Sequence, residues 1–196
     1  AEQAGAEHDM PEMMRSLQAL NLRRKSQNLL PIEIGIGLST GEVLAGSIGS
    51  VKRMDYTVIG DSVNLAARLE SANKHYGTSI LVGGSTVGSL KRKRVLMREV
   101  DLIQVKGKAR PAAVYESLEF HNKETSPNLA RMLPIFEDGL KRYRSQDWTG
   151  AMKRFAEVLE LMPGDGPAKI FIDRCRFYRE RPPGDAWDGV WIMSDK

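Results

Sequence analysis

Asn64 and Arg68 are the side chains in this sequence whose types and spacing suggest chemistry on a phosphate group. They lie in the stretch MDYTVIGDSVNLAARLE (residues 54–70), where an alternating pattern runs through Gly-Asp into a helical one. Residues four apart share one face of a helix. A guanidinium there can take up charge that develops on phosphorus oxygens, and an amide can hold a sugar hydroxyl. The same pair also fits two solvated side chains on an exposed helix, so the spacing alone leaves both interpretations open.

The elements around this pair are expected to alternate between strands and helices. Helices are expected over about residues 8–28 and 62–75, with Asp61 as the N-cap of the second and Gly77 closing it. A tight turn at residues 39–41 is expected to join the first two strands. Strands are expected over residues 32–38, 43–48, 56–59, 80–82, 95–100, 102–105 and 114–120. This alternation predicts an α/β sandwich with a mixed sheet.

Three motifs in chain order resemble the class III adenylyl and guanylyl cyclases. They are GEVLAGSIG at residues 41–49, DYTVIGDSVNLAARLE at 55–70 and VKGK at 105–108. The resemblance covers about residues 8–120 and corresponds to the C-terminal half of the cyclase catalytic domain. It implies a partial ferredoxin-like cyclase domain over residues 1–120.

The resemblance implies roles for four residues. Asn64 resembles the asparagine that orients the ribose, Arg68 the arginine that stabilises the transition state, and Lys106 the lysine that binds the terminal phosphates of ATP. Thr57 stands where many adenylyl cyclases have an aspartate that reads the base, which resembles the class IIIb enzymes of the cyanobacterial and soluble types. A hydroxyl can donate or accept a hydrogen bond, so Thr57 alone does not separate adenine from guanine.

The implied reaction is attack of the 3′-hydroxyl of ATP on its own α-phosphorus, with loss of pyrophosphate and help from two Mg²⁺ or Mn²⁺ ions. The family's metal-binding aspartates lie in the first half of the domain, and those motifs do not occur here. We therefore expect no metal ligand in this chain. In particular, Asp55 and Asp61 are not expected to bind the metal ions. The chain is expected to be an inactive fragment of a homodimeric adenylate cyclase. A non-catalytic regulatory or dimerisation module and a guanylate cyclase making cyclic GMP are the alternatives.

A polar linker, HNKETSPN at residues 121–128, is expected to separate the cyclase part from a helical hairpin extension over residues 129–196. The extension loosely resembles one tetratricopeptide repeat. Its apolar stripes are expected to be too few to close a core alone, so the helices should dock on the cyclase part or its dimer mate. Trp187 and Trp191 are expected to fix the tail to the same body. A peptide-binding or regulatory surface is the alternative.

Composition and charge narrow the class of protein further. The 41% hydrophobic and 28% charged residues are typical of a soluble globular protein. The sequence has no apolar run long enough for a membrane span, and its single cysteine, Cys175, suits a reducing compartment. The net charge of +4 fits a polyphosphate substrate, and no nucleic-acid-binding motif accompanies it. We therefore expect ATP as the partner, no nucleic acid, no membrane segment in this chain and a cytoplasmic location.

Glycines cluster in the first strands, at Gly35, Gly37, Gly41, Gly46 and Gly49. They lie in and between expected strands rather than between a strand and a helix. This placement indicates close packing and turns rather than a phosphate-binding loop.

Overall fold

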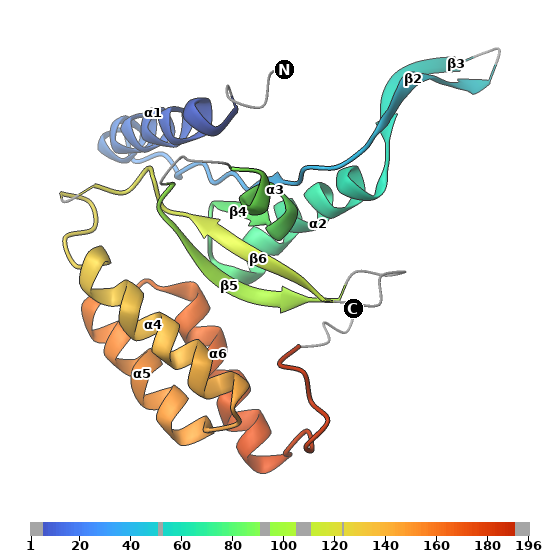
Figure 1. Cartoon of the computed structure of the whole chain (residues 1–196). Helices are drawn as coiled ribbons and strands as arrows, with labels where there is room; N and C mark the ends of the chain where they lie inside the picture. Colours follow the sequence, from blue (N-terminus) through green and yellow to red (C-terminus); the bar gives the residue numbers. More distant parts are fainter. Residues whose placement is uncertain (1–5, 51–52, 91–94, 105–110, 123, 191–196) are drawn as a thin grey trace.

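A four-stranded mixed sheet forms the centre of the first 120 residues in the computed structural model, which describes residues 6–50, 53–90, 95–104, 111–122 and 124–190 (Figure 1). Its strands, in spatial order, are β1 (Ile36–Leu38), β4 (Ile80–Gly83), β6 (Ala112–Ser117) and β5 (Met97–Ile103). β1 and β4 are parallel and the other neighbours are antiparallel. The predicted mixed α/β fold is confirmed. The two strands expected over 95–100 and 102–105 are one strand, because β5 continues through a register shift between Glu99 and Asp101.

Two helices cover opposite faces of this sheet, and a short one, α3 (Gly84–Ser89), follows β4. α1 (Ala6–Ser26) packs Met14 against Ile80 and Val82. α2 (Asp61–Tyr76) packs Leu65 and Leu69 against the other face of the sheet. Because successive strand residues point to opposite faces, β4 can supply both cores.

The sequence predicted the residue that closes α2 correctly, but not the residue that caps its start. Gly77 closes the helix in the left-handed conformation (φ 65°), with its N–H bonded to the Asn73 carbonyl, as predicted. The prediction that Asp61 is the N-cap is wrong. The cap residue is Gly60, no side chain caps the helix, and Asp61 is already the first helical residue. Leu65 and Leu69 are buried on the inner side of this helix, whereas Ala67 is exposed.

β1 lies unusually close to α2. A Cβ atom on Gly37 would lie 2.0 Å from the Ala66 carbonyl oxygen and 2.5 Å from the Glu70 nitrogen. Only glycine fits at such a backbone approach. The interpretation as a packing residue is confirmed for Gly37, whereas nothing lies within 4 Å of a Cβ on Gly46.

β2 (Leu44–Ser50) and β3 (Arg53–Ile59) form a separate antiparallel hairpin that extends away from the sheet (Figure 1). The predicted turn between strands 32–38 and 43–48 is therefore wrong. β1 covers only residues 36–38 and pairs with β4, whereas β2 takes its backbone partners from β3. β1 is held against α2 at Gly37 and in the sheet by its pairing with β4, so it is not the partner of β2.

Three helices follow residue 128: α4 (Leu129–Arg144), α5 (Trp148–Leu161) and α6 (Gly166–Glu180). The extension is therefore a three-helix unit rather than a hairpin. The buried residues of these helices share one core with Leu118 of the cyclase part, so the helices pack on that part as expected, although their own stripes supply nearly all of this core. Phe155 and Phe171 stack at 5.1 Å between ring centroids, and Phe136 meets Phe155 edge-on at 5.3 Å.

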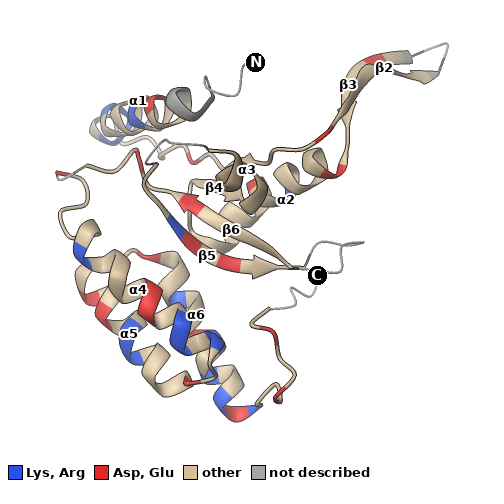
Figure 2. Ribbon diagram, viewed as in Figure 1, with Lys and Arg blue, Asp and Glu red and all other residues tan. Residues whose placement is uncertain are grey.

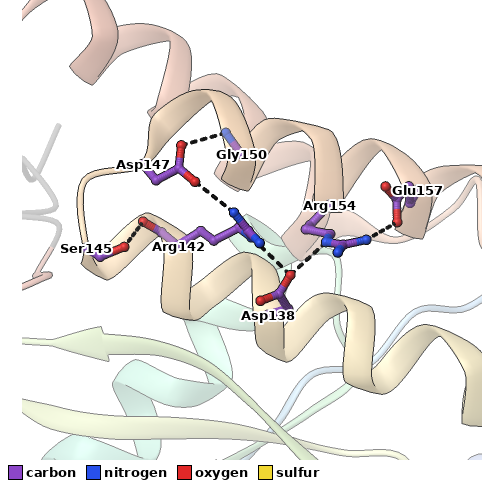
Figure 3. Close-up of polar contacts among 7 residues, drawn as sticks. All are labelled: Asp138, Arg142, Ser145, Asp147, Gly150, Arg154 and Glu157. Carbon is purple, nitrogen blue, oxygen red and sulfur yellow. Dashed lines mark hydrogen bonds and ion pairs between the residues drawn. The ribbon is translucent and has the colours of Figure 1, made fainter.

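Figure 3 shows the outer side of the α4–α5 pair, where Asp138 accepts hydrogen bonds from Arg142 at 3.0 Å and Arg154 at 2.7 Å. Arg142 also meets Asp147, whose other carboxylate oxygen accepts a hydrogen bond from the Gly150 nitrogen and so caps α5. Such half-exposed pairs add little stability each, but together they link α4 to α5.

The chain after α6 returns to the helices. Trp187 packs edge-on against Tyr143, Trp148 and Tyr178, with centroid distances of 5.1 to 5.3 Å. Trp191 lies outside the described residues. None of the helices in the described part of the chain is long and apolar enough to cross a membrane.

Candidate functional site: the exposed side of α2

Asn64 and Arg68 both lie exposed on α2, on the side turned away from its buried residues. The structure therefore brings the pair together on one helix face, as the spacing predicts. Thr57 is exposed on β3, directly across from Gly46 of β2, and β3 leads into α2 through Gly60. Lys106 lies outside the described residues.

The start of α2 is held against the base of the hairpin. The Gly60 carbonyl accepts hydrogen bonds from the nitrogens of Val63 and Asn64, both at 3.1 Å. The Ser62 hydroxyl donates to the Glu42 carbonyl at 3.3 Å, and a Cβ on Gly60 would lie 2.8 Å from that same oxygen. These contacts orient the first turn of α2, which carries Asn64.

A cavity of about 380 Å³ borders this first turn. Hydroxyl and carboxyl groups line it, among them those of Ser39, Thr40, Glu42, Asp61 and Ser62. Leu65 adds apolar surface, so the cavity has a mixed lining with a few polar groups, as small-molecule sites commonly do.

The described residues contain no group of three or more histidine, cysteine, aspartate or glutamate side chains that could hold a metal ion. Asp55 lies on β3 and Asp61 at the start of α2. This donor set does not fit a two-metal site, so we derive no step through metal ions from this chain.

The family model for the adenylate and guanylate cyclase catalytic domain matches residues 6–119, more than half of the chain. The chain belongs to this family. The resemblance predicted from the three motifs is confirmed.

Several relatives of this chain are described as adenylate cyclases. The terminal-differentiation-specific adenylate cyclase of Dictyostelium discoideum is 32% identical over 165 residues, which is 83% of this chain and 8% of that protein. The adenylate cyclase of Anabaena cylindrica is 38% identical over 110 residues, 53% of this chain and 22% of that protein. A solved structure, the adenylyl cyclase CyaB from P. aeruginosa, is 35% identical, with a TM-score of 0.46 over 59% of this chain and 61% of that one. The chain thus spans a small part of the curated relatives it matches.

The match to the Dictyostelium protein is longer than the cyclase domain. Its 165 aligned residues exceed the span 6–119 and the five residues before it, so the similarity runs into the C-terminal helices. The tetratricopeptide resemblance of these helices stays a prediction.

Buried charges join the cyclase domain to the C-terminal helices, and sequence reasoning missed them. Arg174 of α6 donates to the Asp101 carboxylate of β5 at 2.6 Å. Arg98 of β5 forms ion pairs with Glu116 of β6 and with Asp165 just before α6, both at 2.6 Å. Figure 2 shows charges of both signs along β5, the strand nearest the helices. The sequence does contain a signal for these buried charges, because charged residues interrupt the apolar patterns MREVDLI (97–103) and IFIDRCRFY (170–178).

Burial and neighbouring charge change the proton affinities of this cluster. Burial, reinforced by the Asp101 carboxylate, raises the pKa of the Tyr76 phenol, which therefore stays protonated and donates to Asp101. Burial opposes the charge of Arg174, but Asp101 raises the pKa of its guanidinium. Burial raises the pKa of the Glu116 carboxyl, although Arg98 acts in the opposite direction. The Cys175 thiol is also buried, and burial raises its pKa to about 12, so it is a packing residue rather than a nucleophile.

Proposed function

We propose that the protein to which this chain belongs is an adenylate cyclase, which converts ATP to 3′,5′-cyclic AMP and pyrophosphate. The observation that carries the proposal is the exposed Asn64–Arg68 face of α2 in a chain of the cyclase family. Adenylate cyclase relatives at 32% and 38% identity support ATP over GTP.

Each proposed site residue has a role that its chemistry supports. Asn64 holds a ribose oxygen, and Arg68 takes up charge on the α-phosphoryl group as pyrophosphate leaves. Lys106 binds the terminal phosphates as a compact point charge. Thr57 contacts the base through its hydroxyl.

The proposed catalyst is a homodimer, because α2 carries its site residues on an open surface. The β2–β3 hairpin exposes large apolar side chains: Leu44 is 69% exposed, Met54 64% and Tyr56 78%. An exposed apolar surface of this kind is typical of an interface. The Mg²⁺ or Mn²⁺ ions would be held by carboxylates outside the described residues. The reaction is proposed to take place in the cytoplasm, where ATP is available.

The test is product formation by the purified full-length protein with Mg²⁺ or Mn²⁺, offered ATP and GTP in separate reactions. We expect cyclic AMP from ATP at a higher kcat/KM than cyclic GMP from GTP. A preference for GTP would favour a guanylate cyclase, and no product from either nucleotide would favour the non-catalytic module.

A further inference from the structure

The C-terminal end of α2 is completed by residues that lie beyond the matched cyclase domain. Tyr76, the last residue of α2, is 1% exposed, and its hydroxyl donates to Asp101 and accepts from Arg174 of α6 at 3.3 Å. Asp101 and Arg174 are 2% and 3% exposed. The three groups form one buried hydrogen-bonded set that joins α2, β5 and α6.

A close backbone approach also joins α2 to α6. A Cβ atom on Gly166, the first residue of α6, would lie 2.0 Å from the Tyr76 carbonyl oxygen and 3.1 Å from the Gly77 Cα. No side chain larger than a hydrogen fits there. Further along α6, Ile170 packs against the core that contains Leu65, Leu69 and Tyr76. We call the residues Tyr76, Gly77, Asp101, Gly166 and Arg174 the α2–α6 contact.

The α2–α6 contact lies on the helix that presents Asn64 and Arg68. Arg68 is eight residues before Tyr76, which is roughly 12 Å along the helix axis. A hydrogen-bonded helix moves as one rigid element, so a shift or rotation at Tyr76 reaches Arg68. Misplacement of a catalytic group by about 1 Å can cost on the order of 10²-fold in rate.

From this geometry we propose that Arg174 is a positioning residue for the cyclase reaction: α6 holds the end of α2 so that Arg68 is placed correctly on the exposed side. This inference rests on the proposed function for the role of Arg68. The C-terminal helices would then be a working part of the catalytic unit, which agrees with a relative whose similarity continues into them.

The test compares Arg174→Met with Arg176→Met in the full-length protein. Arg176 lies on the same helix but is exposed, and its ion pair among the described residues is a local one with Asp173 at 2.9 Å, so it serves as the matched control. We expect Arg174→Met to lower kcat about 10- to 100-fold with the KM for ATP within about twofold, and Arg176→Met to change neither. Tyr76→Phe keeps the ring and removes only the hydroxyl, so it should also lower kcat. It is the more conservative variant and keeps the test possible if Arg174→Met fails to fold.

A double-mutant cycle separates positioning from general damage. If Arg174 acts through Arg68, adding Arg174→Met to Arg68→Ala should cause little further loss of kcat. A loss that multiplies in full in the Arg68→Ala background would overturn the proposal.

Amide hydrogen exchange on the 196-residue chain gives a readout that does not depend on activity. Arg174→Met should speed exchange in residues 70–76 of α2, and Arg176→Met should not. Unchanged exchange in both variants would show that α6 does not hold α2. If the wild-type full-length protein makes no cyclic nucleotide, the proposed function fails, and the exchange result still decides whether the α2–α6 contact holds the helix.

Discussion

Arg68 occupies a water-exposed position, and this limits what it can do in the isolated chain. Two unit charges 4 Å apart interact by about 1 kcal/mol in bulk water and about 4 kcal/mol near a protein surface of lower effective dielectric constant. The proposed catalytic role of Arg68 therefore requires that substrate and a second protein surface cover its guanidinium. The open face of α2 is consistent with a site that assembly completes.

Arg68→Ala in the full-length protein should reduce kcat by about 10²- to 10³-fold while the KM for ATP changes little. The reason is that the charge it meets develops mainly in the transition state. Steady-state kinetics of cyclic AMP formation measures both constants. Lys74→Ala, which removes an exposed cation from the same helix, is the control and should leave kcat unchanged.

Lys106→Ala provides the contrast, because the phosphates it is proposed to meet are present before the reaction. Its defect should appear in the KM for ATP as well as in kcat. An Arg68→Ala defect confined to KM would show that its proposed role is wrong.

At the scale of elements, α2 is held on two sides by contacts that exclude side chains. Gly37 of β1 meets its middle and Gly166 of α6 meets its end. The Asn73 amide adds a third tie, since it donates to the Ile36 carbonyl of β1 at 3.0 Å. Backbone approaches of this kind define the position of a helix more narrowly than apolar packing, which tolerates rearrangement.

Gly37→Ala should destabilise the chain, because its Cβ would lie 2.0 Å from a backbone oxygen that cannot rotate away. We expect the free energy of unfolding to fall by about 1 to 3 kcal/mol, the usual cost of overpacking. Urea denaturation of the 196-residue chain measures it. Gly88→Ala is the matched control, since nothing lies within 4 Å of its Cβ, and a stability loss of equal size there would contradict the argument.

The interface between the sheet and the C-terminal helices is built differently from the cores on either side of it. Its centre consists of buried ion pairs, with Arg98 shared by Glu116 and Asp165. Both carboxylate oxygens of Asp165 have partners, because the second oxygen accepts a hydrogen bond from the Ala168 nitrogen at 2.8 Å and so caps α6. Removing one partner of such a pair leaves a buried charge and typically costs 3–5 kcal/mol. The interface therefore favours one relative arrangement of the two parts.

Truncation after Phe120 should lower the melting temperature or the solubility of the cyclase part. It would expose Leu118, which packs in the core of the helices, and would leave Asp101 without Arg174. Thermal denaturation of the truncated and the 196-residue chains measures the difference. If the truncated part kept its melting temperature and residues 129–196 folded cooperatively alone, the helices would be an independent module.

At the scale of the whole molecule, the sheet has an open side. β1 is the last strand in the order β1-β4-β6-β5, and no described residue pairs with its outer edge. The unpaired backbone groups of an edge strand can accept another strand.

The 196-residue chain alone should not convert ATP to cyclic AMP. A triphosphate needs cations to offset its charge, and the described residues contain no cluster that could hold them. The measurement is cyclic AMP production by the purified chain with Mg²⁺ or Mn²⁺. Sustained turnover at ordinary enzyme rates would refute this expectation, whereas activity that returns when a partner supplies an intact metal half would support it.

The sequence by itself determined the features that depend on near neighbours. The run from β3 through Gly60 into α2, the Gly77 cap and the shared face of Asn64 and Arg68 all follow from residues a few positions apart. The mixed α/β class and the family follow from the same local patterns taken in order. Local periodicity and turn conformation depend on residues within one or two helical turns of each other, which is why they could be predicted.

Only the tertiary structure decided which distant residues meet. Tyr76 and Arg174 are 98 positions apart, and nothing in either local pattern indicates the other. The departure of β2 from the sheet and the core of α4–α6 also depend on partners far along the chain. Such pairings are selected by the fit of whole surfaces and by the cost of burying an unpaired charge, and both exist only once the chain has folded.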